Sequence, residues 1–439
     1  SLRRRQRQMC IRDRRYTLMD RGWTHLRPED VVLAEVLWDS GYITAFITDT
    51  YHLHKPKMAY ERGFDYVLFI RGQEADPYIT DPNIKVDLSK WHVKNYLTAH
   101  DKAVFTQYLK NISHWKDEED HFIVQVVKAG LDWLKSQIDR GRRDKLFLWL
   151  DSFDPHEPWD PPKEYYSLYA PEEYDDLPII QPSIGGSEGG LLKNFTELEV
   201  KHIRAQYAGE VTLVDKWFGF FLDRVKDLGL WEETMIILIS DHGEPLGEHG
   251  IIRKVRPWPY EELSRIVLMI KPPESLRESK NQRVNAFVQT PDIMPTILDV
   301  LGISRDRSKW SVTPKIQGVS LLPLMLGDEE ESLREYAIAG HYRRSWSIRN
   351  EKYSLYIWPS PGSSYTFGTR LIEEQEKVRS ELYKLRRDYV PPKPENWSIG
   401  EQPEKVNVMD EERDVAEGLE HELLRRLIEI QDYVFQRRL

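Results

Sequence analysis

The stretch from Met235 to Lys254 constrains the fold and function of this chain more than any other. Five apolar residues, three of them isoleucine, lead directly into Ser240-Asp-His-Gly-Glu. This length suits a buried strand and is too short for a membrane span. In open α/β sheets ligands bind beyond the carboxyl ends of the strands, so Asp241 and His242 are well placed to hold a metal ion or an anion. For an isolated Asp-His pair, capping of a turn is the alternative role.

Apolar strands alternate with amphipathic helical segments through most of the chain. The expected strands are 43–47, 66–70, 145–150, 235–239 and 266–270. The expected helices are 29–40, 118–140 and 196–229. Such alternation is typical of a mainly parallel sheet with helices on both faces. We therefore expect an α/β domain over residues 15–330.

The pattern changes at about residue 336 to short segments of alternating polarity. Asn350-Glu-Lys lies between two such segments and predicts a hairpin turn. A further strand is expected at residues 381–385, followed by a charged amphipathic helix over 411–438. These elements predict a small C-terminal α+β subdomain over residues 331–439.

Composition excludes several classes of protein. The formal net charge is −10, and no broad basic face suggests a nucleic-acid partner. A single cysteine, Cys10, excludes an internal disulfide framework and a thiolate zinc cluster. No run of about 18 apolar residues exists, so we expect no helix that spans a membrane. Residues 1–14 carry six arginines and no apolar region, and we expect them to be a foreign or disordered tail.

Six motifs in a fixed order resemble those of one known family. They are Phe153-Asp-Pro-His-Glu-Pro-Trp, Tyr207-Ala-Gly-Glu-Val, Ser240-Asp-His-Gly-Glu, Thr290-Pro-Asp-Ile-Met-Pro-Thr, Gly318-Val-Ser-Leu-Leu-Pro and Glu381-Leu-Tyr-Lys-Leu. The set resembles the sulfatases of the alkaline-phosphatase-like superfamily. This resemblance implies an alkaline-phosphatase-like fold and hydrolysis of a small-molecule or carbohydrate sulfate ester. It also implies one divalent cation, usually Ca²⁺, and a nucleophile made by oxidising a cysteine to formylglycine.

The resemblance assigns roles to four residues. Asp241 and His242 match the second pair of metal ligands, and the histidine leaves room for Mn²⁺ or another cation as well as Ca²⁺. His156 matches the histidine that contacts the sulfate or assists the leaving group. Lys254 matches the lysine that neutralises the sulfate charge. The structural alternatives are a histidine packed between prolines and Trp159, and a solvated surface lysine.

A departure from the family pattern follows the first expected strand. His52 matches the histidine of a Gly-Lys-Trp-His-Leu segment, which reads Asp49-Thr-Tyr-His-Leu here, and the resemblance implies a catalytic role for it in contact with the anion. Thr50 stands in place of the lysine, so one anion contact would be a hydroxyl group instead of a charge. Lys55 is close enough in the sequence to replace that charge. We also expect His249 to brace the loop that follows the Asp-His pair.

The family nucleophile has no clear counterpart. It lies in a Cys-x-Pro-Ser-Arg motif, upstream of a Gly-Arg-Tyr segment. Arg15-Tyr16 resembles the tail of that Gly-Arg-Tyr segment. Counting back places the nucleophile near Arg4, and Cys10 is rejected because Arg12 occupies the proline position. The Asp-Asp pair that supplies the other metal ligands would lie further upstream. We therefore expect an N-terminally truncated sulfatase, with weak cation binding and negligible turnover for residues 1–439.

Two other functions remain open. Thr50 favours a phosphonate monoester or phosphodiester hydrolase of the same superfamily, because we associate a threonine at this position with those enzymes. A non-catalytic fragment that keeps only the scaffold is the third candidate. Turnover of aryl sulfates and phosphodiesters separates the two enzymes, and cation titration tests the third.

Overall fold

The computed structural model describes most of the chain, in eleven segments. They are residues 25–28, 30–92, 99–182, 194–254, 259–276, 283–304, 318–327, 333–341, 345–357, 380–385 and 404–435. The predicted tail over 1–14, the expected nucleophile position, Cys10 and the predicted domain boundary at 330–331 lie outside these segments. The described residues form two compact units, His25–Thr234 and the chain from Met235 onward.

The first unit is built on a three-stranded parallel sheet. Its strands are β1 (Ile43–Thr48), β2 (Tyr66–Phe69) and β3 (Leu146–Asp151), in the order β2-β1-β3. The central strand β1 is buried from Thr44 to Thr48, as expected of a strand covered on both faces. The three strands predicted in this part of the chain, and their parallel pairing, are confirmed.

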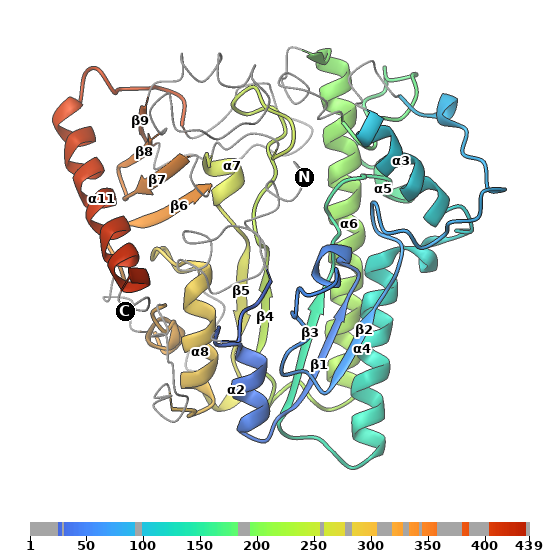
Figure 1. The fold of residues 1–439 in the computed structure, drawn as a ribbon, viewed down its shortest axis with the longest axis horizontal. Coiled ribbons are helices and arrows are strands. Elements are labelled where there is room, and N and C mark those ends of the chain that lie inside the picture. The colour runs from blue at the N-terminus through green and yellow to red at the C-terminus, as the bar shows by residue number, and fades with distance from the viewer. Residues whose placement is uncertain are drawn as a thin grey trace. The chain divides into compact units, whose positions relative to one another are not determined.

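Helices flank this sheet. They are α2 (Leu33–Asp39), α3 (Ala99–Asn111), α4 (Phe122–Asp139), α5 (Lys163–Tyr166) and α6 (Glu197–Asp227), with the short 3-10 helices η2 (Tyr51–Leu53), η3 (Leu88–Lys90) and η4 (Glu118–Asp120). A reciprocal capping box between Thr196 and Glu199 starts α6. Figure 1 shows α4 and α6 side by side, where Val127 and Leu213 belong to one buried cluster.

A buried histidine on α6 makes the stability of this unit depend on pH. The backbone N–H of Ile179 donates to Nε2 of His202 (3.0 Å), so Nδ1 carries the proton and donates to the hydroxyl of Tyr166 (2.8 Å). Burial and, to a smaller extent, the nearby His92 lower the pKa of His202 to about 4. A second proton would face the N–H of Ile179, so the folded state keeps this imidazole neutral.

We expect His202 to stabilise the fold less as the pH falls. Its folded pKa lies below the unfolded value of about 6.5, so the unfolded state binds the proton first, and stability is lost between about pH 6.5 and 4. Urea unfolding compares the wild type with His202→Gln across this range. The difference between their free energies of unfolding cancels the contributions of other titrating groups. The wild type should lose about 3 kcal/mol relative to the variant. A constant difference would show that His202 does not titrate with folding.

The second unit begins with a two-stranded antiparallel sheet. It consists of β4 (Ile236–Ile239) and β5 (Leu268–Lys271), with Ile236 opposite Lys271. Residues 266–270 were expected to add a strand to a mainly parallel sheet, and the strand found there pairs antiparallel with β4. A parallel return usually needs a long crossover helix, whereas the described residues of the connection here contain one helix, the four-residue α7 (Glu261–Ser264).

Two of the six motifs pack against each other in this unit. The 3-10 helix η7 (Thr290–Asp292) leads into α8 (Ile293–Val300), and α9 (Leu322–Met325) begins within the Gly318 motif. A further 3-10 helix, η6, covers Glu274–Leu276. A Cβ atom on Gly318 would lie 1.8 Å from the backbone oxygen of Pro291, so only glycine allows this approach. The two motifs therefore fix one corner of the fold.

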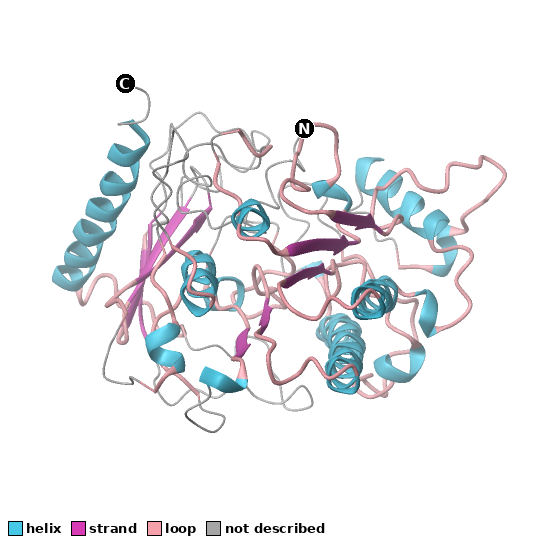
Figure 2. Ribbon diagram, turned by 90° about the horizontal axis from the view of Figure 1, so that it is seen from below, coloured by secondary structure: helices cyan, strands magenta, loops and turns pink. Residues whose placement is uncertain are grey.

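The C-terminal part contains a four-stranded antiparallel sheet and a long helix. The strands are β6 (Ala337–His341), β7 (Ser345–Arg349), β8 (Tyr353–Ile357) and β9 (Glu381–Lys384), and the helix is α11 (Arg413–Phe435). Figures 1 and 2 show α11 lying along this sheet, where Ile348, Leu355 and Leu419 belong to one buried cluster. Asn350 accepts the N–H of Tyr353 across the β7–β8 turn (2.8 Å). The predicted hairpin, strand and terminal helix are confirmed.

Candidate active site

The predicted site residues belong to two clusters, one in each unit. Thr50, His52 and His156 lie in the first unit, and Asp241, His242 and Lys254 lie in the second. The clusters follow the carboxyl ends of β1, β3 and β4, where ligands of α/β proteins bind. The first cluster is Thr50, His52, Lys55, Glu74, His156 and Glu157. The second cluster is Asp241, His242, Glu244 and Lys254.

Both ring nitrogens of His52 are engaged. Its Nε2 lies 2.8 Å from Oε2 of Glu74, and its Nδ1 lies 2.7 Å from Nζ of Lys55. The ordinary pKa of a lysine ammonium is about four units above that of an imidazolium, so the shared proton stays on Lys55. Nδ1 therefore accepts, and the N–H at Nε2 donates to the buried carboxylate of Glu74. The imidazole of His52 is thus neutral and held in one tautomer.

His156 approaches the same carboxylate from the loop after β3. Ligand atoms of His156, Glu157 and Glu74 all lie within 4.8 Å of one another. The ring of Phe153 contacts His156 (centroids 4.0 Å apart) and lies 6.5 Å from the ring of His52. The structure therefore brings the two predicted histidines together around Glu74, a contact that the sequence does not reveal.

The structural alternative for His156 involved the neighbouring Trp159. Trp159 is fully buried, donates from Nε1 to the backbone oxygen of Pro155 (3.0 Å) and packs edge-to-face on Tyr207. Nδ1 of His156 donates to the backbone oxygen of Glu157 (2.7 Å). The tautomer that results places the proton on Nδ1 and the lone pair on Nε2.

Thr50 directly precedes η2, the turn that carries His52. Its side chain is buried, and its backbone N–H donates to Oγ1 of Thr48 (2.9 Å). The hydroxyl of Thr48 in turn donates to Oδ2 of Asp151 (2.6 Å), which ties the ends of β1 and β3 together. The segment that carries Thr50 and His52 is therefore anchored to two strands.

Buried acidic residues lie beneath the first cluster. Gln73 donates to Oδ1 of Asp154 (2.9 Å), and Phe153 donates its backbone N–H to Oδ1 of Asp49 (2.6 Å). Burial raises the pKa of Asp154 to about 6, and burial together with Asp154 and Asp151 raises the pKa of Asp49 well above its ordinary value. These carboxyl groups retain protons at mildly acidic pH, which limits the negative charge below the histidines.

Asp241 and His242 present two donor atoms side by side. Nδ1 of His242 donates to the backbone oxygen of Gly243 (2.7 Å), so the lone pair is on Nε2. That nitrogen lies 3.5 Å from Oδ2 of Asp241, while Oδ1 of Asp241 accepts the backbone N–H of His242 (2.9 Å). A backbone carbonyl that fixes the tautomer in this way is a regular feature of histidines that bind metals.

The loop beyond this pair carries Lys254 and an acidic residue that we did not assign a role. Leu246 and Ile252 form an antiparallel bridge, which closes the loop and returns the chain towards Glu244. Burial raises the pKa of Glu244 to about 7, while Lys254 and its backbone N–H act in the opposite direction. Glu244 was visible within Ser240-Asp-His-Gly-Glu, but the sequence did not show that Lys254 returns to it.

His249 braces the same loop, as expected. Its Nδ1 lies 2.8 Å from Oε1 of Glu262 on α7, and its ring stacks on Tyr260 with centroids 3.8 Å apart. The bond to Glu262 raises the pKa of His249 although burial lowers it. The loop is thereby tied to α7 by both a charged hydrogen bond and a ring contact.

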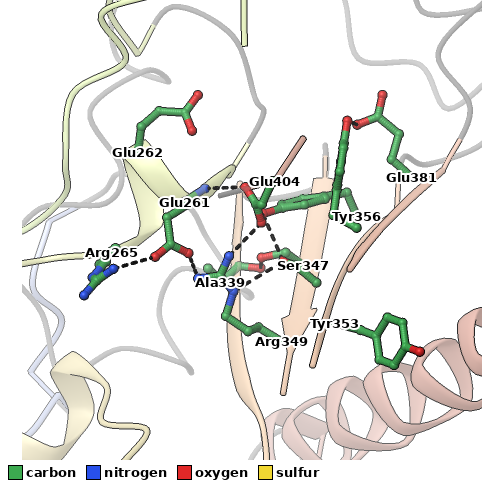
Figure 3. A network of polar contacts seen from close by, with 12 residues as sticks. Glu261, Glu262, Arg265, Ala339, Ser347, Arg349, Tyr353, Tyr356, Glu381 and Glu404 are labelled. Carbon is green, nitrogen blue, oxygen red and sulfur yellow. Dashed lines mark hydrogen bonds and ion pairs between the residues drawn. The ribbon is translucent and has the colours of Figure 1, made fainter. Parts of the chain in front are cut away.

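The start of α7 is held by the C-terminal sheet. Figure 3 shows the buried carboxylate of Glu404 accepting the backbone N–H of Glu261 (2.9 Å) and the guanidinium of Arg349 (2.7 Å). The hydroxyl of Tyr356 also donates to Glu404, and Arg349 pairs with Glu261. The C-terminal sheet therefore supports the loop of the second cluster through α7.

Gly243 lies against the backbone of α7, and we expect its substitution to destabilise the second unit. A Cβ atom there would lie 2.1 Å from the backbone oxygen of Glu262, which cannot move freely. Gly243→Ala should cost about 1–3 kcal/mol in urea unfolding. Gly418→Ala on α11 is the control, because its Cβ meets open space and helix propensity favours alanine by about 1 kcal/mol. Equal effects would contradict the close-approach argument.

Within the described segments, two groups of three His, Asp or Glu residues could hold an ion. One is Glu74, His156 and Glu157, and the other is His249, Glu262 and Glu404. Asp241 and His242 are not joined by a third such residue in that part of the chain. The second group is already committed to Arg349 and backbone donors, so it is better suited to bracing than to metal binding.

Solved structures define the class of fold. The chain is similar to the phosphonate monoester hydrolase of Agrobacterium radiobacter, with a TM-score of 0.62, 18% identity, and coverage of 92% of this chain and 82% of that one. It is also similar to a protein solved in complex with its substrate D-glucosamine-2-N,6-O-disulfate, with a TM-score of 0.58, 17% identity, and coverage of 93% and 83%. The alkaline-phosphatase-like α/β fold that we expected is confirmed.

Sequence comparison defines the family. The sulfatase family model matches residues 11–303, and the chain belongs to the sulfatase family. An arylsulfatase of Clostridium perfringens is 29% identical over 63% of this chain and 58% of its own length. A choline-sulfatase of Rhizobium meliloti is 27% identical over 54% of this chain and 46% of its own length. The matched regions thus cover less than two thirds of these relatives. No helix in the described segments is long and apolar enough to cross a membrane.

Proposed function

We propose that the whole protein hydrolyses sulfate esters. Membership of the sulfatase family supports this function, and the arrangement after β4 carries it: Nε2 of His242 and Oδ2 of Asp241 lie 3.5 Å apart, with the imidazole tautomer set by Gly243. Relatives named arylsulfatase and choline-sulfatase, and a neighbour solved with a disulfated glucosamine, support a small-molecule or carbohydrate sulfate ester as substrate.

The donor set at Asp241 and His242 fits one divalent cation. A carboxylate oxygen suits Ca²⁺, and the imidazole nitrogen also accommodates Mn²⁺. When bound, the cation screens the sulfate oxygens and stabilises charge that develops on them. The carbonyl of Gly243 keeps the proton on Nδ1 and the donor lone pair on Nε2. We retain formylglycine as the expected nucleophile of the whole protein.

Lys254 and His156 take the other two roles. Lys254 neutralises sulfate charge, since its ammonium can donate to ligand oxygens from a long side chain. In its protonated form, His156 supplies the proton that the leaving alkoxide needs, from Nε2, because Nδ1 is bonded to the carbonyl of Glu157. The Glu157 carboxylate lies 3.2 Å from Nδ1 and would stabilise the protonated ring.

A phosphonate monoester or phosphodiester hydrolase is the second candidate. Thr50 favours it, because a neutral hydroxyl replaces a charged lysine near the anion. A protein of Trinickia caryophylli named as a multifunctional alkaline phosphatase superfamily protein is 30% identical over 42% of this chain and 38% of its own length. The fold neighbour from Agrobacterium radiobacter is named a phosphonate monoester hydrolase.

Comparative turnover by the whole protein separates the candidates. We expect kcat/KM for 4-nitrophenyl sulfate to exceed that for bis(4-nitrophenyl) phosphate by about tenfold or more. The reverse ratio would favour the phosphodiester hydrolase. Turnover of neither substrate in the presence of Ca²⁺ or Mn²⁺ would favour the non-catalytic alternative.

A further inference from the structure

We propose that Arg71 and Tyr78 form a subsite for the alcohol part of the ester, and that this part is a hydroxyl-rich sugar ring. The inference rests on the proposed function, because it names the class of sulfate ester that the protein takes. Both residues belong to the loop after β2, residues 71–78, which also carries Glu74 of the first cluster. One loop thus carries a buried residue of the cluster and two exposed side chains.

Asn111 on α3 holds this loop in one shape. Its side chain is buried and donates to the backbone oxygens of Gly72 and Asp76 (2.8 Å each). It also accepts the backbone N–H of Ile79 (3.0 Å). Glu74 has a φ of 47°, in the left-handed region, which a residue with a side chain keeps only where its surroundings impose it. A loop fixed in this way loses little freedom when it binds a ligand.

Asp76 fixes the guanidinium of Arg71 and offsets its charge. Two N···O distances of 2.7 Å join Arg71 to this carboxylate, which is fully buried, whereas the Arg71 side chain is 42% exposed. Nε and Nη2 make these bonds, and Nη1 makes no hydrogen bond to another residue in the described part of the chain. The subsite therefore offers oriented N–H donors with little net charge, which favours neutral hydroxyl groups over a second anion.

Tyr78 adds an aromatic surface next to this guanidinium. The guanidinium carbon of Arg71 lies 5.5 Å from the ring centre of Tyr78 and 5.5 Å from that of Phe69. Tyr78 is nevertheless 48% exposed. A pyranose has C–H groups on its faces and hydroxyl groups around its edge. An aromatic ring beside fixed N–H donors matches both of these features.

Tyr51 links this surface to the first cluster. Its ring centre lies 5.2 Å from that of His52, the next residue in η2. Burial and the charge of Asp76 raise the pKa of the Tyr51 hydroxyl, whereas Arg71 lowers it, because both charged groups lie near that hydroxyl. A sulfate ester bound at the first cluster can therefore extend past Tyr51 to Arg71 and Tyr78.

Turnover of sulfated disaccharides by the whole protein tests the subsite. Disaccharides of heparan sulfate and chondroitin sulfate, which carry sulfate at different positions, are compared with 4-nitrophenyl sulfate. We expect at least one disaccharide to have the lower KM. Tyr78→Ala leaves the Arg71–Asp76 pair in place. It should lower kcat/KM for that disaccharide about tenfold, through KM, and change kcat/KM for 4-nitrophenyl sulfate by less than about twofold.

Tyr66→Ala is the matched control for this variant. Tyr66 is 40% exposed on the same sheet but lies at the opposite end of β2, so its loss should change kcat/KM for neither substrate. Tyr78→Phe keeps the ring and should retain most of the activity on the disaccharide. Equal losses for the two substrates in Tyr78→Ala would indicate a merely structural role and overturn the inference. A lower KM for 4-nitrophenyl sulfate than for every disaccharide would also overturn it.

Binding of unsulfated sugars separates failure of this inference from failure of the proposed function. Saturation-transfer NMR of residues 1–439 with the same disaccharides, without their sulfate groups, requires no turnover. We expect about tenfold weaker affinity for Tyr78→Ala than for the wild type and Tyr66→Ala. Sugar binding that depends on Tyr78, without hydrolysis of any sulfate ester, would support the subsite and reject the proposed function. Hydrolysis of 4-nitrophenyl sulfate without sugar binding would reject the subsite alone.

Discussion

Replacing Asp241 by alanine is expected to lower kcat/KM for an aryl sulfate by about 10³-fold in the whole protein. Asp241 would supply the charged oxygen donor beside Nε2 of His242, and loss of a bound cation removes several kcal/mol of transition-state stabilisation. Steady-state kinetics with added Ca²⁺ or Mn²⁺ measures the effect. A loss confined to KM would indicate ground-state binding alone.

Asp223→Ala provides the matched control for this variant. Asp223 is an exposed aspartate on α6 that pairs with Lys226 at the surface. Its removal should leave kcat/KM unchanged and cost less than about 1 kcal/mol of stability. Wild-type kinetics for the Asp241 variant would reject Asp241 as a metal ligand.

Replacing Arg334 by methionine is expected to cost about 3–5 kcal/mol in the free energy of unfolding. The two terminal nitrogens of the Arg334 guanidinium each lie 2.5 Å from a carboxylate oxygen of Asp292, which has no exposed surface. The same carboxylate accepts the backbone N–H groups of Gln289 and Val319, so it joins two of the family motifs. Removing Arg334 would leave this buried charge without its cationic partner. Urea unfolding at neutral pH measures the change.

Arg265→Met tests whether burial causes the effect. Arg265 also pairs with a carboxylate, that of Glu261, but its side chain is 68% exposed. Its loss should therefore cost less than about 1 kcal/mol. Similar costs for the two arginine variants would show that the Arg334–Asp292 pair is not the anchor inferred here.

The parts of the fold with a regular hydrophobic period could be predicted from the sequence. β1, β2, β3 and α6 lie within two residues of their expected positions, because each combines a strong apolar pattern with a clear start or stop signal. The direction of β5 could not be predicted, since an apolar run does not record which way the strand pairs.

Some residues of the candidate site could likewise be predicted from the sequence, and others could not. Asp241, His242, His52 and His156 could be singled out because they follow strands in recognisable motifs. Glu74 could not, because its contact with His52 joins residues 22 positions apart and depends on the turn at η2. A search of every strand end for acidic residues would have included it, since Arg71-Gly-Gln-Glu closely follows β2.

The location of Mn²⁺ in crystals of the whole protein tests the central claim most directly. Anomalous scattering identifies the ion without assuming a reaction. We predict a peak about 2.0–2.3 Å from a carboxylate oxygen of Asp241 and from Nε2 of His242. A peak at Glu74, His156 and Glu157 instead, or no peak near Asp241 at saturating Mn²⁺, would contradict the account.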